Sequence, residues 1–402
     1  MSSKQEVGAQ RTELLGSRLT SLFGIEIHLH ISVIIIFALI VTGLGRGVLP
    51  QWHPDWSMLA CWIAATIAGV LFFCSLLAHE MSHALVARSR GIQTKRITLF
   101  LFGGVAAIEA EPRNPKDELL IAAAGPLMSL ALSLLFGLLV VLIDGPAIDV
   151  NASEPSSIVA SLSGAGTVAI WLSTVNLMLA LFNLIPGFPM DGGRLFRAAL
   201  WWRSGDMVWA TRQASKGGRL FGWFLIFSGM WMLLGGATID GIWLILIGWF
   251  IDHLAKISVT QLLLDQALEH TTVSAIMRTH FDKVPNNISA ESFIADYVLR
   301  SRQQTWPIEA KDADLGYLTI DSLPSERDPQ RLKAMQIVDY MTPLDEANAL
   351  APSTNARTAQ RLILQRKDPL PVLDQGRVVG LVDQLDILRW FDHLARTRES
   401  TS

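Results

Sequence analysis

The chain has 402 residues, of which 50% are hydrophobic and only 17% are charged, and its mean hydropathy is +0.36. Soluble domains carry roughly 25% charged residues, so the composition indicates a membrane protein with a soluble part. The net charge of −3 is too small to favour a nucleic-acid partner. Cys61 and Cys74 lie in one apolar stretch, which excludes a disulfide framework and a cysteine-based metal site.

Six apolar stretches are candidates for membrane-spanning helices, each of which needs about 20 residues. They are Ile25–Leu44, Met58–Ala78, Leu119–Ile143, Val168–Leu184, Leu220–Leu234 and Ile239–Ile251. The second is predicted to continue as a helix to about Arg88. The last two are shorter, and the glycines between them indicate a tight hairpin of two spans. We therefore expect six spans.

Lysine and arginine residues gather in the segments before the first span, after the second and after the fourth. The loops on the other side contain Arg46 alone. Because cytoplasmic loops are rich in lysine and arginine, we expect a multi-pass protein of the cell membrane with both termini in the cytoplasm.

From about Leu254 the composition becomes that of a soluble α/β region, and an internal repeat appears with an offset of 64 residues. It relates SAIM at 274–277 to VDYM at 338–341, WPI at 306–308 to LPV at 370–372, and GYL at 316–318 to GLV at 380–382. Several matches at one offset indicate a tandem duplication. The expected domains are a membrane domain, 1–253, and a duplicated region, 254–402, with copies at about 270–325 and 334–395.

In the sequence AHEMSHA at 78–84, the ionisable residues begin at His79, directly after the twenty-one uncharged residues 58–78, and ionisable groups at membrane depth are costly. His79 and His83 are four residues apart, so on a helix they project from one face and can bind one zinc ion. Glu80 cannot easily reach the same ion, but it can accept a proton from water that attacks a carbonyl. The alternative is a polar end to a buried helix, which would not ordinarily gather two histidines and a glutamate.

A catalytic zinc ion usually has three protein ligands and one open position. The third is predicted to be Asp191, in FNLIPGFPMDGGRLFRA at 182–198, where Pro186 and Pro189 interrupt the helix. Irregular backbone at membrane depth is tolerated only where it is buried in protein or lines a watery cavity. The alternative role for Asp191 is the N-cap of the following helix.

The two motifs together resemble the HExxH and NxxPxxPxDG pair of the site-2 protease family, which are intramembrane zinc metalloproteases. They stand here as HEMSHA at 79–84 and NLIPGFPMDG at 183–192, and Gly125-Pro126 resembles a further motif of that family. The resemblance covers the whole membrane region.

By this resemblance, one catalytic Zn²⁺ is bound by His79, His83 and Asp191, Glu80 is the general base, and Asn183 helps to bind the substrate. The protein would be a zinc metalloendopeptidase acting in the lipid bilayer. It would hydrolyse peptide bonds within or near the transmembrane segments of membrane-anchored proteins, such as an anti-sigma factor or another membrane-tethered regulator.

The segment LFLFGGVAAIEAE at 99–111 resembles the membrane-edge hairpin of the family, where a strand could pair with an unwound substrate. Gly103 and Gly104 are therefore predicted to bind substrate, and the alternative is an ordinary apolar loop. His28 and His30 alternate before the first span and are predicted to be interfacial side chains rather than metal ligands.

The duplicated region resembles the paired cystathionine-beta-synthase (CBS) domains of one branch of the family, and such pairs often bind ATP or another adenine nucleotide. The nucleotide pattern is roughly G-x-x-T/S-x-x-D. The first copy has Thr319 but Ser322 in place of the aspartate, and the second has Asp386 but Asp383 in place of the hydroxyl, where a carboxylate would repel phosphate. Thr319 and Asp386 are the candidate nucleotide-binding residues, and the alternative role of the pair is homodimerisation or partner binding.

The expected fold is thus an α-helical polytopic membrane protein with about six transmembrane helices and a small membrane-edge β element, followed by a cytoplasmic α/β module of tandem CBS domains. A transporter or channel gated by the CBS pair is the rival function. It predicts ionisable residues along several spans, whereas here they gather at two points. A proteolytically inactive scaffold is a third possibility, against which the intact Glu80 argues.

Overall fold

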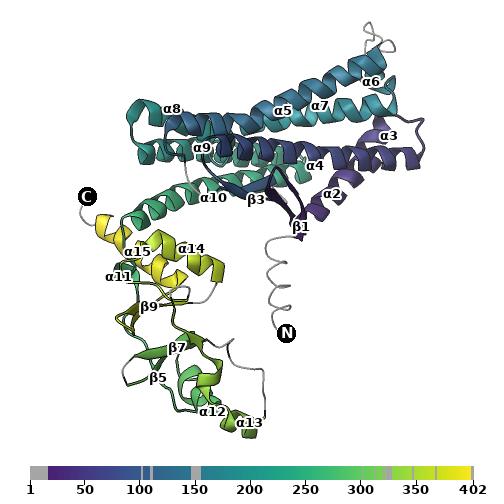
Figure 1. Ribbon diagram of the computed structural model, residues 1–402. Coiled ribbons are helices and arrows are strands. Elements are labelled where there is room, and N and C mark those ends of the chain that lie inside the picture. Colours follow the sequence, from purple (N-terminus) through teal and green to yellow (C-terminus); the bar gives the residue numbers. More distant parts are fainter. Residues whose placement is uncertain are drawn as a thin grey trace. The chain divides into compact units, whose positions relative to one another are not determined.

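The computed structural model describes residues 17–100, 103–108, 112–145, 155–301, 303–311, 313–319, 322, 328–345, 348–366 and 369–399 (Figure 1). The chain divides into two compact units, Met1–Val259 and Thr260–Ser402. The first consists mainly of long helices, and the second is a smaller α/β unit.

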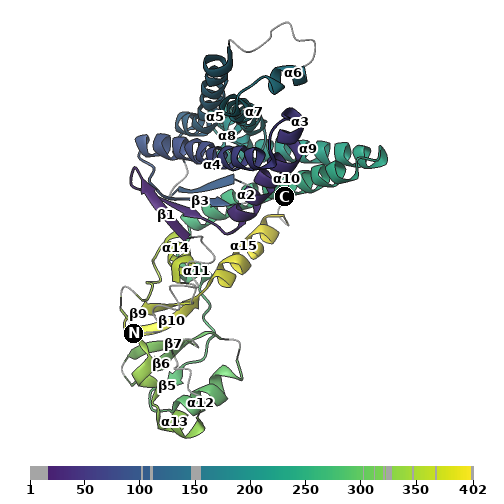
Figure 2. The ribbon, with the colours of Figure 1, turned by 90° about the vertical axis from the view of Figure 1, so that its right-hand side faces the viewer.

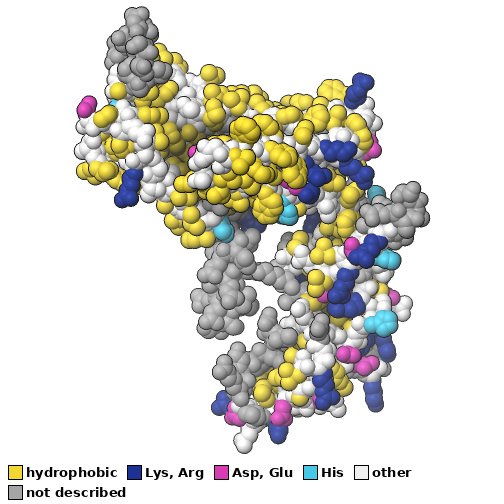
Figure 3. Space-filling model, turned by 180° about the vertical axis from the view of Figure 1, so that it is seen from behind, with side chains coloured by type: hydrophobic (Ala, Val, Ile, Leu, Met, Phe, Trp, Pro, Cys, Tyr) yellow, Lys and Arg dark blue, Asp and Glu magenta, His cyan; other side chains and the backbone are white. Residues whose placement is uncertain are grey.

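In the described part of the chain, six helical segments are long and apolar enough to cross a membrane, which confirms the expected number. They are Ser32–Trp52 (α2, η1 and α3), Met58–Ser89 (α4), Pro115–Asp144 (α5), Gly164–Asn183 (α7), Met207–Leu234 (α9) and Thr238–Glu269 (α10). Hydrophobic side chains cover much of the surface of this unit (Figure 3). A bilayer provides the apolar surroundings that such a surface requires.

The first span begins later than the sequence predicted. Ile25–Leu29 form strand β2, which pairs antiparallel with β1 (Ser17–Leu22), and α2 begins only at Ser32. The side chains of Ile25 and Ile27 are buried while those of Glu26 and His28 are more exposed, which is the period of a strand. The average hydropathy of Ile25–Leu44 does not reveal this alternation.

The last two spans are longer than their apolar cores. Helix α9 begins at Met207 rather than near Leu220, and α10 continues past Ile251 to Glu269. The hairpin between them turns at Gly236, where φ is +88°. Backbone hydrogen bonding continues a helix beyond the stretch whose side chains are apolar.

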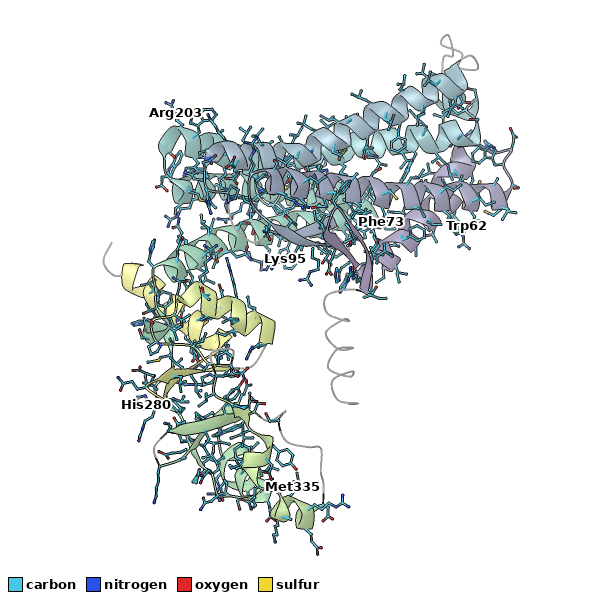
Figure 4. All side chains as sticks on the ribbon, viewed as in Figure 1. Trp62, Phe73, Lys95, Arg203, His280 and Met335 are labelled. Carbon is cyan, nitrogen blue, oxygen red and sulfur yellow. The ribbon has the colours of Figure 1, made fainter. Side chains whose placement is uncertain are left out.

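A four-stranded sheet, β1-β2-β3-β4, lies against the part of α4 that carries HEMSHA (Figures 1 and 2). Strand β3 (Thr94–Phe100) runs parallel to β2 and antiparallel to β4 (Gly103–Ile108). Buried residues of the sheet such as Ile97 pack with Met81 and Ala84 of α4, and Phe73 covers the same cluster (Figure 4). The small β element of the expected fold is therefore present, with β4 at one edge of the sheet.

Helices α4, α5 and α7 pack side by side, and two short helices complete the described membrane unit. Helix α6 is Pro155–Ala160, and α8 is Asp191–Ser204, which packs on α5 and α9. The break before α8 is tied to α9 by the Phe188 N–H, which donates to the Ala214 carbonyl at 3.2 Å. This break fixes where α8, and with it Asp191, begins.

The second unit contains both copies of the repeat. The elements of the first are α11 (Val273–Ile276), β5 (Val284–Pro285), α12 (Ala290–Phe293), η3 (Ile294–Val298), β6 (Thr305–Glu309) and β7 (Asp314–Thr319). Those that follow are α13 (Pro329–Ala334), η5 (Ile337–Tyr340), β8 (Thr342–Pro343), α14 (Ala356–Arg366), β9 (Leu370–Asp374), β10 (Arg377–Val382) and α15 (Gln384–Glu399).

The short helix at the start of each copy packs against a strand of the other copy. A β-carbon built on Gly316 of the first copy would lie 2.8 Å from the sulfur of Met341 in the second. A β-carbon on Gly380 of the second would lie 2.5 Å from the sulfur of Met277 in the first. Because Met277 and Met341 occupy equivalent positions, each copy packs its own short helix onto the strand of the other.

Candidate metal centre

The two histidines of α4 and the first residue of α8 meet inside the membrane unit. The Nε2 atoms of His79 and His83 lie 3.3 Å apart, and each is close to Oδ2 of Asp191, at 3.2 and 3.1 Å respectively. Both histidines are buried, with 2% and 5% of their surface exposed. The three ligands predicted from sequence thus form one triangle of donor atoms.

The size of this triangle fits one zinc ion. Zinc binds histidine nitrogen and carboxylate oxygen at about 2.0–2.2 Å, and tetrahedral angles then separate neighbouring ligand atoms by about 3.3–3.5 Å. The observed separations of 3.1–3.3 Å are close to this range.

The other ring nitrogen of each histidine is already engaged by α5. Nδ1 of His83 donates to the Ile121 carbonyl at 2.6 Å, and Nδ1 of His79 lies 2.8 Å from the Ser129 hydroxyl oxygen. A carbonyl can only accept, so the proton of neutral His83 is on Nδ1 and its Nε2 lone pair faces the triangle. Such contacts to the far nitrogen are the usual support of metal-binding histidines.

Gly125 of α5 leaves the space that the two rings occupy. A β-carbon at this position would lie 2.5 Å from Nε2 of His79 and 2.7 Å from Cε1 of His83. Both distances are shorter than van der Waals contact, so any other side chain at position 125 would displace the imidazoles. The glycine of the Gly125-Pro126 motif therefore has a steric role in the centre.

Asp191 is not the N-cap of α8, so that alternative is wrong. The N-cap is Met190, which makes no side-chain capping bond, and Asp191 is the first helical residue. Its carboxylate faces the histidines instead. A carboxylate in the first turn is also favoured by the positive end of the helix dipole.

A cavity of about 790 Å³ opens beside the triangle. The predicted site residues that line it are His79, Glu80, His83, Gly104, Asn183 and Asp191. Its apolar wall comes largely from α7 and α10 and includes Phe182, Trp243, Trp249 and Phe250. The donor triangle is thus reached through a space bounded by membrane-spanning helices.

Glu80 and Gly104 contact each other in the wall of this cavity. A β-carbon on Gly104 would lie 2.8 Å from the carboxyl carbon of Glu80, so strand β4 passes directly over the glutamate. Asn183, at the end of α7, donates from Nδ2 to the Leu179 carbonyl at 3.0 Å. Gly103 precedes Gly104 in β4 and pairs with Phe100.

The remaining sequence candidates lie away from the triangle. His28 is in β2, where its Nε2 lies 3.2 Å from Oε2 of Glu26. Nδ1 of His30 lies 2.8 Å from the Ser32 hydroxyl oxygen. Neither histidine belongs to the metal-binding group found among the described residues, which is His79, His83 and Asp191.

The two candidate nucleotide residues are both nearly buried, at 8% exposure for Thr319 and 7% for Asp386. Thr319 ends β7, and its hydroxyl oxygen lies 2.9 Å from that of Ser322. Asp386 lies in the first turn of α15 and accepts the Asp383 N–H at 3.1 Å, while the Asp386 N–H donates to the Asp383 carboxylate at 2.8 Å. Thr319 belongs to the first copy and Asp386 to the second.

Sequence reasoning missed the supporting contacts of the histidines. Ser129 is a polar residue in the middle of an apolar span, which is a signal that could have marked it. Ile121 acts through its backbone carbonyl and leaves no such signal. The aromatic wall from α10 was also missed, because aromatic residues in a span are ordinary.

Residues 67–227 match the family described as Peptidase family M50. Rip3 of Mycobacterium tuberculosis, named as a zinc metalloprotease, is 35% identical over 377 residues, which cover 92% of this chain and 91% of that protein. The chain belongs to the site-2-type zinc metalloproteases of peptidase family M50. With its six candidate spans, this metalloprotease is an integral membrane protein.

Two solved structures resemble parts of the metalloprotease. The site-2 protease from Methanocaldococcus jannaschii is 29% identical and has a TM-score of 0.39, covering 60% of this chain and 94% of that one. The CBS domain of a bacterial CNNM/CorC-family Mg²⁺ transporter, solved in complex with ATP, is 21% identical with a TM-score of 0.28. It covers 32% of this chain and 92% of its own.

Proposed function

We propose that this metalloprotease hydrolyses peptide bonds within or near the transmembrane segments of membrane-anchored proteins. The observation that carries the proposal is the triangle of His79, His83 and Asp191 beside Glu80, in a cavity walled by membrane-spanning helices. A peptide that reaches these groups must enter between such helices, so a membrane segment is the fitting substrate.

The chemistry requires two functions, which we assign to different residues. His79, His83 and Asp191 would hold the zinc ion, which acts as a Lewis acid toward water and the scissile carbonyl when bound. The Glu80 carboxylate accepts a proton from the attacking water and gives it to the leaving amine nitrogen. Its place next to His79 in HEMSHA keeps it in the same cavity as the ligands.

Substrate binding is assigned to strand β4 and Asn183. Strand β4 is at the edge of the four-stranded sheet, and an edge strand can pair through its free backbone groups with an unwound segment. Gly103 and Gly104 give such a segment close access to the backbone, and Gly104 is adjacent to Glu80. The side-chain amide of Asn183 lines the same cavity and can bond the substrate backbone.

The proposed topology places both termini in the cytoplasm. An even number of spans returns the chain to the side on which it began, and the lysine- and arginine-rich loops favour the cytoplasmic side. HEMSHA lies in the last third of α4, toward that side. Cleavage there would release a cytoplasmic domain, for example from an anti-sigma factor or another membrane-tethered regulator.

We assign the C-terminal unit a regulatory role in which an adenine nucleotide binds at Thr319 and Asp386. Thr319 ends strand β7 of the first copy, and Asp386 lies in the first turn of α15, shortly after strand β10 of the second copy. The test is the unfolding temperature of the full chain with and without ATP, in wild type and in Thr319→Val and Asp386→Asn. If ATP leaves the unfolding temperature of the wild type unchanged, nucleotide binding is rejected. A homodimer through this unit would be tested by the particle mass in detergent.

The main experiment compares wild type with Glu80→Gln on a membrane-spanning substrate in proteoliposomes, together with zinc analysis. The variant should retain one zinc ion and cleave at least about 100-fold more slowly, because it lacks the base. Glu26→Gln, in strand β2, is the matched control and should cleave normally. Equal cleavage by Glu80→Gln would reject the mechanism, and ion flux that persists after zinc removal would favour a transporter.

A further inference from the structure

One face of α5 holds both histidines of the zinc site. The Ile121 carbonyl and the Ser129 hydroxyl bond the far nitrogens of His83 and His79, and Gly125 lies between them against both rings. These three positions are four residues apart, so they follow one face of the helix. Helix α5 thereby sets the orientation of both imidazoles, but Asp191 belongs to a different helix.

A buried ion pair connects the helix of Asp191 to the same face. Arg197 of α8 donates from Nε to Oε1 of Glu118 at 2.6 Å, and its Nη2 contacts the same oxygen. Glu118 stands three residues before Ile121 and so continues the face of α5. The side chain of Arg197 is 8% exposed and that of Glu118 is 0% exposed, so the contact is closed to solvent.

Arg197 also contacts the segment on the other side of Asp191. Its guanidinium carbon lies 5.2 Å from the centre of the Phe188 ring, in the break that precedes α8. This is the distance of a cation–π contact. Arg197 therefore contacts the segment before Asp191 and belongs to the helix that Asp191 begins. Its guanidinium is paired with Glu118 of α5.

A buried ion pair is a poor source of net stability compared with apolar side chains of the same size. Its directional hydrogen bonds can instead fix the orientation of the groups that form it. A metal ligand must be held within about 0.5 Å of its productive position. A pair that fastens α8 to α5 less than two turns from Asp191 is suited to that requirement.

We propose that Glu118 and Arg197 are positioning residues that set the location of the Asp191 carboxylate relative to His79 and His83. Helix α5 then orders all three ligands, two by direct hydrogen bonds and the third through this ion pair. The inference rests on the zinc site proposed above and adds to it how the third ligand is held.

The test measures zinc affinity of the full-length protein in detergent, by competition with a chelator. Glu118→Gln and Arg197→Lys should each weaken zinc binding by about 10–100-fold, as loss of an outer contact does elsewhere. The visible absorption of bound Co²⁺ should change as well, because it reports ligand geometry. The double variant should weaken zinc binding by less than the two single effects added together, because both substitutions remove the same contact.

Arg219→Lys is the matched control, because its guanidinium bonds Asp252 at 3.0 Å and joins α9 to α10 instead. It should leave zinc affinity and the Co²⁺ spectrum unchanged. Unchanged values in folded Glu118→Gln and Arg197→Lys would overturn the inference. A lower unfolding temperature of the zinc-free protein with normal zinc affinity would also overturn it, because the pair would then be merely structural.

Asp191→Ala in the same assay separates this inference from the proposed function. If Asp191→Ala binds zinc normally, the proposed site itself is wrong. If only Asp191→Ala loses affinity, the site stands and the positioning role of the ion pair fails. Should one of the ion-pair variants not fold, the other still decides the outcome.

Discussion

The α-carbon of Gly125 faces the imidazole of His79 so closely that a β-carbon on it would lie 2.5 Å from Nε2. The centre therefore requires glycine at position 125 as well as the three ligands. This relationship leads to a prediction that separates zinc binding from helix stability.

Gly125→Ala should lower zinc affinity by about 100-fold, because its methyl group must displace the rings that hold the metal. Alanine favours a helix over glycine by about 0.5–1 kcal/mol, so a weaker helix cannot explain the loss. Zinc competition measures the effect. Gly43→Ala in α2, where a β-carbon meets no atom within 4 Å, is the control and should bind zinc normally. Normal binding by Gly125→Ala would contradict the geometry.

Gly104→Ala should keep zinc but lose activity. Its methyl group would lie 2.8 Å from the Glu80 carboxyl carbon and displace the proposed base. Cleavage of a membrane-spanning substrate should fall by about 100-fold or more, while zinc content stays at one ion. Full activity would show that Glu80 tolerates the displacement, and loss of zinc would show that the variant disturbs α4 as well.

Ser129→Ala removes the hydroxyl that bonds Nδ1 of His79. The ring loses its fixed orientation, and we expect zinc affinity to fall by about 10–100-fold. Ser133→Ala is matched to it, because Ser133 lies one turn further along α5 and donates to the Ser173 carbonyl instead. Chelator competition should separate the two variants, and equal affinities would argue against a role for Ser129.

The stability of the C-terminal unit should depend on pH through Asp386. Burial and the neighbouring Asp383 carboxylate raise the pKa of Asp386 to about 6, from an ordinary value of 3.8. Between about pH 4 and about pH 6 the folded unit keeps a proton that the unfolded chain releases, so its stability falls as pH rises through this window. Hydrogen exchange of the strand β10 amides in the full chain measures this slope.

Asp386→Asn should flatten the slope and stabilise the unit near pH 7, because asparagine keeps an acceptor for the Asp383 N–H without the charge. Asp392→Asn, on the exposed part of α15, is the control and should retain the wild-type slope. A slope that persists in Asp386→Asn would assign it to another group.

Sequence reasoning predicted the chemistry better than the boundaries. HEMSHA and PMDGG identified the three residues of the ligand triangle, and the apolar stretches predicted the number of spans, because metal-ligand spacing and apolar length are local properties. The first span was placed too early, because Ile25 and Ile27 are apolar as in a span but are buried in a strand that pairs with β1 and β3. The role of Asp191 stayed open between ligand and N-cap, because both need a carboxylate at the start of a helix.

The sequence by itself determined which residues could bind zinc, how many times the chain could cross a membrane, and that its tail is duplicated. Only the tertiary structure decided which nitrogen of each histidine faces the ligand triangle, because that follows from contacts with Ile121 and Ser129 on another helix. It also joined Arg197 to Glu118, which are 79 residues apart. Such pairings arise from helix packing, and a local pattern does not contain them.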